Sequence, residues 1–227
     1  MTPSVSTPRR ILAVTDAGGS QIALQSALAL ADRHGASVEV MACIEPPHDL
    51  SILSRFTGKD PDSLIGEAVE RTHETVRARL SEIAPNRAMD LTVPVGKPYL
   101  EIIRHVADRG CDFVVKTAEP LAGLDRFLFA STDQHLLRKC PCPVWLQTPK
   151  AAKHPRRILA AVDLDTRDAD EPETLVALNR RVAETACLLA GGPDSAVIVL
   201  HAWDVIGEGM IWAFPGGQDA RMSSELY

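Results

Sequence analysis

A nine-residue segment occurs twice in this chain. Residues 8–16 read PRRILAVTD and residues 155–163 read PRRILAAVD, so that seven of nine positions are identical at an offset of 147 residues. A repeat at this spacing indicates a duplicated structural unit, and about 100–150 residues is an ordinary domain size. The sequence therefore predicts one complete copy of a domain followed by part of a second.

The first copy alternates short apolar runs with amphipathic segments. Apolar runs without a helical period predict strands at 11–16, 37–44, 90–95, 112–117 and 143–147. Apolar residues three and four apart predict helices at 20–35, 60–85, 98–110 and 133–139, whereas 48–59 reads as a polar loop. This order predicts an α/β domain, a parallel sheet with helices on both faces.

The same pattern restarts after the basic, proline-punctuated stretch 148–157, which reads as a linker. Residues 158–163, 172–190 and 195–203 predict a strand, a helix and a strand. The expected organisation is a domain at 1–147, a linker at 148–157 and a partial second copy (βαβ) at 158–227. Such a unit leaves a strand edge open, so we expect a truncated form, or an edge covered by the first domain or by a second chain.

Charge, hydropathy and cysteine content narrow the function classes. Lys and Arg number 24 against 30 Asp and Glu, and the net charge of -6 disfavours a nucleic-acid partner. The apolar run 11–14 is too short for a signal peptide or a membrane span, so we expect a cytoplasmic protein without membrane contact. Five cysteines in such a chain predict reduced thiols and no disulfides.

Polar residues at the expected carboxyl ends of strands mark a candidate ligand site, because parallel sheets bind ligands there. Asp16 ends the first strand, and Lys116 and Thr117 end the fourth. Ser131 and Thr132 can each cap the next helix, whose free amides could receive a phosphate. Asp163 repeats Asp16. Each of these aspartates would either bind a nucleobase or ribose or accept amides from its own loop.

Two further motifs each have a structural alternative. Residues 17–20, AGGS, are compatible with a phosphate loop and equally with a plain turn that caps a helix. Cys140-Pro141-Cys142 resembles half of a metal site, but no second pair stands at zinc spacing, which favours packing at a helix-to-strand corner. Because the sequence contains no HExxH, GxSxG or P-loop pattern, we predict no catalytic residue, no metal site and no enzyme.

Four segments resemble the universal stress protein family: PRRILAVTD, VEVMACIEP, VGKPYLEIIRHVADRGCDFVVK and STDQHLLRKCPCPVWL. The chain looks most like the tandem E-type branch, in which two such domains are fused. The resemblance implies a Rossmann-like, five-stranded parallel sheet of order 3-2-1-4-5. It also implies pairing through the last strand, as a homodimer or between tandem domains.

Nucleotide-binding members of that family carry the spacing Gly-x2-Gly-x9-Gly followed by Ser or Thr. Aligned back from Cys140-Pro141 with one inserted residue allowed, the three glycine positions fall on Lys116, Glu119 and Ala130, and only Ser131 and Thr132 match. Glycine lets a backbone approach phosphates closely, whereas Glu119 would add a negative charge where a triphosphate lies. The departure disfavours ATP, and we expect no cofactor.

Three functions are consistent with this sequence. The first is a non-enzymatic accessory or regulatory protein of the stress response, with a degenerate ATP motif and a pocket open to a different small molecule. The second is an ATP-binding stress sensor that uses Asp16, Cys43, Ser131 and Thr132. The third is an adenylyl-transfer or pyrophosphatase-type enzyme that uses Asp16, Lys116 and the loop 18–20. Nucleotide titration combined with a turnover assay separates them.

Overall fold

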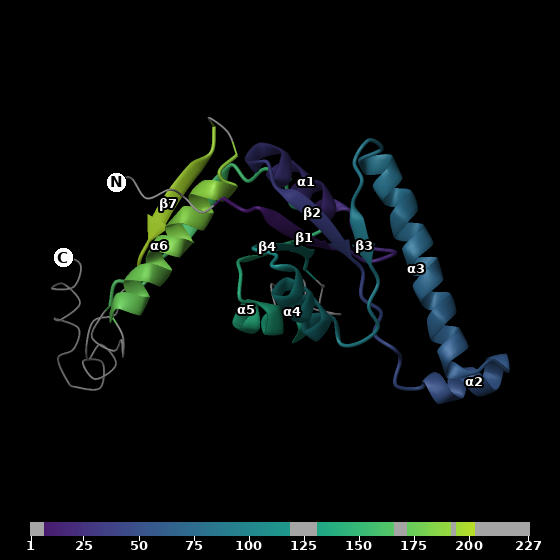
Figure 1. Ribbon diagram of the computed structural model, residues 1–227. Helices are drawn as coiled ribbons and strands as arrows, with labels where there is room; N and C mark the ends of the chain where they lie inside the picture. Colours follow the sequence, from purple (N-terminus) through teal and green to yellow (C-terminus); the bar gives the residue numbers. More distant parts are fainter. Residues whose placement is uncertain (1–6, 119–130, 166–171, 192–193, 203–227) are drawn as a thin grey trace, which may run out of the picture. The chain divides into compact units, whose positions relative to one another are not determined.

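The computed structural model describes residues 7–118, 131–165, 172–191 and 194–202. The chain forms two compact units, 1–155 and 156–227, and their boundary falls inside the segment interpreted above as a linker. The elements of the first unit are shown in Figure 1 and are β1 (Arg10–Val14), α1 (Ile22–His34), β2 (Ser37–Met41), α2 (Leu50–Thr57), α3 (Pro61–Ile83), β3 (Asp90–Thr92), α4 (Pro98–Arg109), β4 (Phe113–Thr117), α5 (Ser131–Lys139) and β5 (Val144–Gln147).

The five strands of the first unit form one parallel sheet in the order β3-β2-β1-β4-β5, which confirms the predicted topology. β1 is central, and its register places Leu12 opposite Glu39 of β2 and Val14 opposite Lys116 of β4. The strand order reverses between β1 and β4. Since all strands run in one direction, the carboxyl ends of β1, β2 and β4 meet at one edge, where such folds bind ligands.

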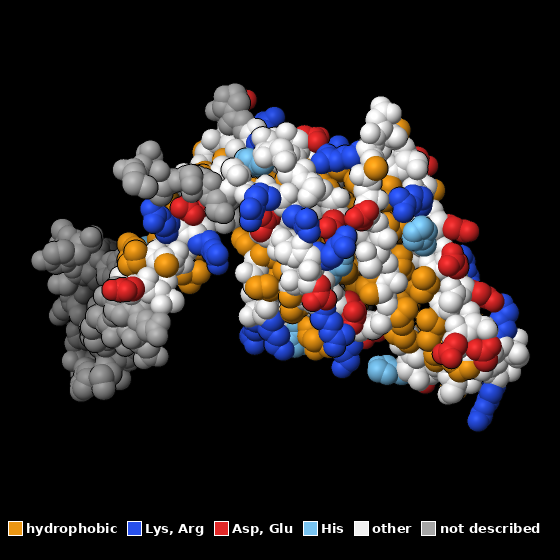
Figure 2. Space-filling view, in the orientation of Figure 1, with side chains coloured by type: hydrophobic (Ala, Val, Ile, Leu, Met, Phe, Trp, Pro, Cys, Tyr) orange, Lys and Arg blue, Asp and Glu red, His pale blue; other side chains and the backbone are white. Residues whose placement is uncertain are grey.

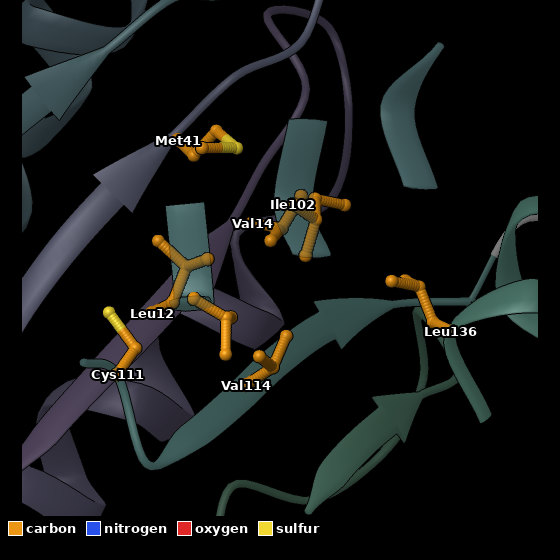
Figure 3. Packing of buried hydrophobic residues seen from close by; sticks show 8 residues of the cluster. Leu12, Val14, Met41, Ile102, Cys111, Val114 and Leu136 are labelled. Atoms are coloured by element: carbon orange, nitrogen blue, oxygen red, sulfur yellow. The ribbon is translucent and has the colours of Figure 1, made fainter. Parts of the chain in front are cut away.

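Helices cover both faces of this sheet (Figure 1). α1 and the C-terminal half of α3 cover one face, and α4 and α5 cover the other. On the second face a cluster of buried side chains from β1, β2, β4, α4, α5 and the α4–β4 connection forms the core shown in Figure 3. It is made of Leu12, Val14, Met41, Ile102, Val106, Cys111, Val114 and Leu136. Apolar residues on both faces of the strands explain why the sheet residues read as continuous apolar runs.

Local signals define most helix ends. The Asp60 carboxylate accepts the Ser63 backbone N–H at 2.9 Å at the start of α3, and Pro61 occupies the first helical position. Gly35 and Gly110 end α1 and α4 with φ of 69° and 66°. The start predicted for α5 is corrected by two residues, because Ser131 and Thr132 belong to the first turn of the helix.

The loop predicted at 48–59 is wrong, because Leu50–Thr57 forms the helix α2. Its apolar residues Leu50, Leu53 and Phe56 do stand three apart, a helical spacing that the interpretation as a polar loop missed, and none of them is buried: Phe56 is 85% exposed. Apolar side chains gather over this end of the molecule, along α2 and α3 (Figure 2). Gly58, with φ of 67°, ends the helix and is a further local signal for it.

The second unit, taken by itself, has the βαβ order that the repeat predicts. It consists of β6 (Arg157–Ala161), α6 (Pro172–Leu189) and β7 (Ala196–Leu200), and its two strands pair in parallel. Leu159 lies opposite Ile198, and these side chains are 58% and 51% exposed. Ala160, on the other face of the sheet, is buried. Within the described residues, α6 therefore covers one face of a two-stranded sheet.

Candidate functional site

Three of the predicted site residues meet at the carboxyl edge of the sheet. Asp16 follows β1, Cys43 follows β2 and Lys116 lies near the end of β4. The pKa of the Cys43 thiol is raised to about 12, mainly by burial and then by the negative charges of Glu101 and Asp16, while Lys116 acts in the opposite direction. The side chains of Asp16, Cys43, Glu101 and Lys116 therefore share one electrostatic environment, in which Cys43 stays protonated at neutral pH.

Lys116 is the central charged group of this edge. Its ammonium donates to the Asp133 carboxylate at 2.9 Å and to the Thr117 carbonyl oxygen at 3.0 Å. The side chains of Lys116 and Asp133 are only 5% and 0% exposed. Asp133 lies in the first turn of α5, where a carboxylate also interacts favourably with the helix dipole. The position aligned with the first glycine of the ATP motif thus contributes to a buried ion pair.

Ser131 and Thr132 share this first turn of α5 with Asp133. The Thr132 side chain is buried, with 8% exposure, and nothing is described of the Ser131 side chain. A phosphate bound to the amides of this turn would approach the Asp133 carboxylate, and like charges in a poorly solvated place repel strongly. Glu119 and Ala130, the other predicted departures from the motif, lie outside the described residues.

The side chain of Thr117 does not lie with those of Lys116 and Asp133. Successive residues of a strand point to opposite faces, so Thr117 lies on the α1 face while Lys116 lies on the α5 face. Its register partner is Gln147 of β5, whose amide donates to Ser26 of α1 at 2.9 Å. The buried Thr117 Oγ1 and Gln147 Oε1 atoms have no hydrogen-bond partner among the described residues.

Asp16 begins a tight turn. The Asp16 carbonyl oxygen accepts the Gly19 backbone N–H at 3.3 Å and the Arg79 guanidinium at 2.9 Å, while Ser20 Oγ accepts the Ile22 N–H at 3.3 Å. The loop 17–20 is accordingly a turn. The predicted Ser20 cap is corrected, because the N-cap of α1 is Gln21, which makes no side-chain cap hydrogen bond. The Asp16 carboxylate itself is exposed. Arg79, on α3, was missed because it stands among the charged residues of an amphipathic helix, such as Arg77 and Glu82, and resembles them.

Asp163 lies in the second unit and has its own local partners. Its carboxylate accepts the Asp165 backbone N–H at 3.0 Å, and its backbone N–H donates to Asn179 of α6 at 3.0 Å. This is the alternative in which a strand-end aspartate receives amides from the following loop. The nucleobase or ribose contact of Asp163 remains a prediction.

A second buried charge cluster was not predicted from the sequence. Glu39 of β2, His105 of α4 and Cys111 place potential metal-ligand atoms within 4.8 Å of one another. The Glu39 carboxylate already contacts His105 at 2.8 Å, Arg109 at 3.3 Å and Arg10 at 3.6 Å. Burial and Glu39 raise the pKa of the Cys111 thiol to about 11. Two guanidinium groups and a protonated thiol disfavour a cation here, and the cluster is a buried ion-pair network.

The sheet order and the switch-point edge define the first unit as a Rossmann-like α/β domain of the nucleotide-binding type. The sequence profile of the universal stress protein family matches residues 7–147, and the chain belongs to this family. In the part of the chain that the structure describes, no helix is both long and apolar enough to cross a membrane.

Individual relatives agree with this assignment. Universal stress protein E of Escherichia coli K12 is 36% identical over 94 residues, which cover 41% of this chain and 28% of that protein. Its counterpart in Photorhabdus laumondii subsp. laumondii is 24% identical over 178 residues, or 77% of this chain and 56% of that protein. This chain thus spans only part of the length of these relatives.

A solved structure shows the same fold over nearly the whole chain. A functionally unknown protein from Pseudomonas aeruginosa PAO1 superposes with a TM-score of 0.60 and 17% identity, over 99% of this chain and 72% of that one. At this identity the likeness concerns the fold alone.

Proposed function

We propose that this protein is a non-enzymatic regulatory protein of the stress response, whose first domain keeps the nucleotide-binding fold but does not bind ATP in the manner of the three-glycine motif. The observation that supports this proposal is the Lys116–Asp133 ion pair, which occupies the start of α5. In this position Lys116 stabilises a carboxylate of its own chain, and a phosphate would have to replace that carboxylate.

A phosphate that draws the Lys116 ammonium to itself weakens the pairing of Lys116 with Asp133, whose side chain is fully buried. Depriving a buried charge of its partner costs about 3–5 kcal/mol. Since each 1.4 kcal/mol is about a factor of ten in affinity, ATP binding would be weakened by roughly two to four orders of magnitude. A ligand without a phosphate at this position does not incur this cost, so a different small molecule remains compatible with the edge.

Titration of the full chain with labelled ATP and ADP, with and without Mg²⁺, followed by a turnover assay, tests the proposal. We expect neither saturable binding in the micromolar range nor product. Asp133→Asn should strengthen nucleotide binding, and Asp108→Asn, which removes an exposed carboxylate of α4, should not. Micromolar binding without turnover would favour the ATP-binding stress sensor, and measurable product would favour the adenylyl-transfer or pyrophosphatase-type enzyme.

The second part of the proposal concerns the partner. β5 is an edge strand that pairs with β4 alone among the described strands of its sheet. Its carbonyl groups at Pro143 and Gln147 accept from Val114 and Ala118 on the β4 side, so the alternate N–H group of Leu146 points outward. We propose that a second copy of this chain, or its own second domain, covers this edge, because open edges are normally covered.

Light scattering and hydrogen exchange of the Leu146 amide test this pairing. A dimer with a protected amide supports a second copy, and a monomer with a protected amide supports the second domain. Leu146→Pro removes the outward N–H without removing a bond to β4 and should abolish pairing, whereas the control Leu146→Ala should not. Fast exchange at Leu146 in the unmodified chain would contradict both forms of the proposal.

A cytoplasmic location and the absence of a nucleic-acid partner remain proposals, the latter supported by the net charge of -6.

A further inference from the structure

The segment Cys140-Pro141-Cys142 joins the end of α5 to the start of β5 and holds two thiols side by side. The two Sγ atoms lie 3.7 Å apart, and both side chains are half-buried. The segment is anchored on both sides: Cys140 donates its backbone N–H to Leu136 at 2.9 Å, and the Pro143 carbonyl accepts from Val114 at 3.0 Å. The chain therefore holds the thiols close together at a corner that is partly open to solvent.

The two thiols differ from each other and from the other buried cysteines. The hydrogen bond with Cys142 lowers the pKa of Cys140 to about 7, although burial acts in the opposite direction. The same hydrogen bond and burial raise the pKa of Cys142. Cys43 and Cys111 have pKa values raised to about 12 and about 11. Cys140 is thus the thiol that forms a thiolate near neutral pH, and Cys142 is the neighbour that stabilises it.

Packing alone does not account for this arrangement. Cys140 and Cys142 do pack against the core cluster of Figure 3, as a corner residue would. Core packing, however, needs neither two sulfur atoms in contact nor a thiol whose pKa is lowered. A metal site is not favoured either, because a zinc ion takes four ligands and the one group of three potential ligands in the described parts of the chain is Glu39, His105 and Cys111.

We infer that Cys140 and Cys142 form an oxidisable dithiol site, whose substrate is a hydroperoxide and whose product is a reversible intramolecular disulfide. In the first step the Cys140 thiolate attacks one peroxide oxygen. The O–O bond breaks, Cys140 becomes a sulfenic acid, and the leaving oxygen takes a proton and departs as water or alcohol. In the second step Cys142 attacks the Cys140 sulfur, the S–O bond breaks, and the thiol proton and the hydroxide leave as water. Two thiols are oxidised and one peroxide is reduced.

The distance suits the second step. A disulfide bond is about 2.0 Å long, so the two sulfur atoms, now 3.7 Å apart, must approach by about 1.7 Å. The partner sulfur is already in hydrogen-bond contact with the Cys140 sulfur, which favours ring closure over further oxidation of Cys140. This inference does not depend on the function proposed above.

The test uses the full chain, reduced and freed of metals with a chelator, then treated with hydrogen peroxide, blocked with an alkylating reagent and digested with trypsin. Cleavage after Lys139 and Lys150 gives one peptide, 140–150, that contains both cysteines. We expect this peptide to become two hydrogens lighter and to escape alkylation, and a dithiol reductant should restore it. In Cys142→Ser, Cys140 should instead be trapped as a sulfenic acid by dimedone. In Cys140→Ser, loss of the Cys142 thiol should slow by at least about tenfold.

Cys187→Ser is the matched control, because this cysteine is exposed and outside the pair; oxidation of the 140–150 peptide should proceed in it at the unmodified rate. Serine differs from cysteine by one atom, and far-UV circular dichroism confirms that each variant is folded. The inference is overturned if the peptide keeps both thiols while Cys187 is oxidised, if Cys140 proceeds to a sulfinic acid beside a free Cys142, or if the disulfide joins two chains. The first measurement needs no variant and decides the matter by itself.

Discussion

Breaking the Lys116–Asp133 pair from one side should destabilise the first domain strongly, and removing both charges should not. The side chains are 5% and 0% exposed and lie 2.9 Å apart, so the pair is held away from water. Lys116→Met or Asp133→Asn each leaves one charge buried, at a cost of about 3–5 kcal/mol in unfolding free energy. The double variant leaves neither charge, and should fall within about 2 kcal/mol of the unmodified chain.

Urea unfolding followed by circular dichroism measures these differences, and hydrogen exchange at Val114 and Val115 assigns them to the sheet of the first unit. The control is Arg71→Met, which breaks the exposed α3 pair with Glu67, 3.8 Å apart, and should cost less than about 1 kcal/mol. If Lys116→Met and Asp133→Asn lower the unfolding free energy as little as this control does, the two charges are not desolvated. Additive costs in the double variant would mean that the two groups do not interact.

Three other perturbations test the fold. Gly66→Ala, at an exposed position inside α3 with open space around it, should stabilise the chain by about 0.5–1 kcal/mol. Gly35→Ala, where φ is 69°, should destabilise it by about 1–2 kcal/mol. Thermal unfolding compares the two variants. Phe56→Ser should change the urea midpoint little because the ring is 85% exposed, while Leu136→Ala in the core should cost about 2–5 kcal/mol. The hydrogen bonds from Ser63 lower the pKa of Asp60, so its stabilising contribution is present above the unfolded-state pKa and is lost as the pH falls through the lower folded-state value. Asp60→Asn should therefore remove part of the acid sensitivity of urea unfolding, and an unchanged pH profile would contradict the cap.

The sheet was predictable because both of its faces are covered. Buried strands such as β1 and β4 appear in the sequence as continuous apolar runs, and glycines such as Gly35 and Gly110 mark where the intervening helices end. α2 was not predictable in the same way. The spacing of Leu50, Leu53 and Phe56 is helical, but the segment is only eight residues long, half of them polar, and none of them is buried, so it resembled a loop.

The candidate site was only half predictable. The residue at the end of a strand can be read from the sequence, whereas an ion pair between a strand and a helix depends on how the two elements pack together. Lys116 was identified from its place at the end of β4. Its partner Asp133 resembled an ordinary acidic residue in a first helical turn. One signal was available: a lysine within the apolar run FVVKT must be desolvated, and a desolvated ammonium needs a buried anion. Asp133 is the first acidic residue of the helix that follows β4 in the described chain.

Lys116 and Thr117 show why adjacent residues need not share a site. The pleat of β4 places Lys116 toward α5 and Thr117 toward α1, while Asp16 and Cys43, far apart in sequence, act on the same side as Lys116. The topology therefore preserves the edge at which a nucleotide-binding fold holds its ligand, whatever side chains stand there. In this chain the cation at that edge already has an anion, so the charge that would attract a phosphate is satisfied before any ligand arrives. Recognition by this protein is then expected to depend on surfaces with unsatisfied groups, such as the outward N–H of Leu146 on β5, rather than on the edge itself.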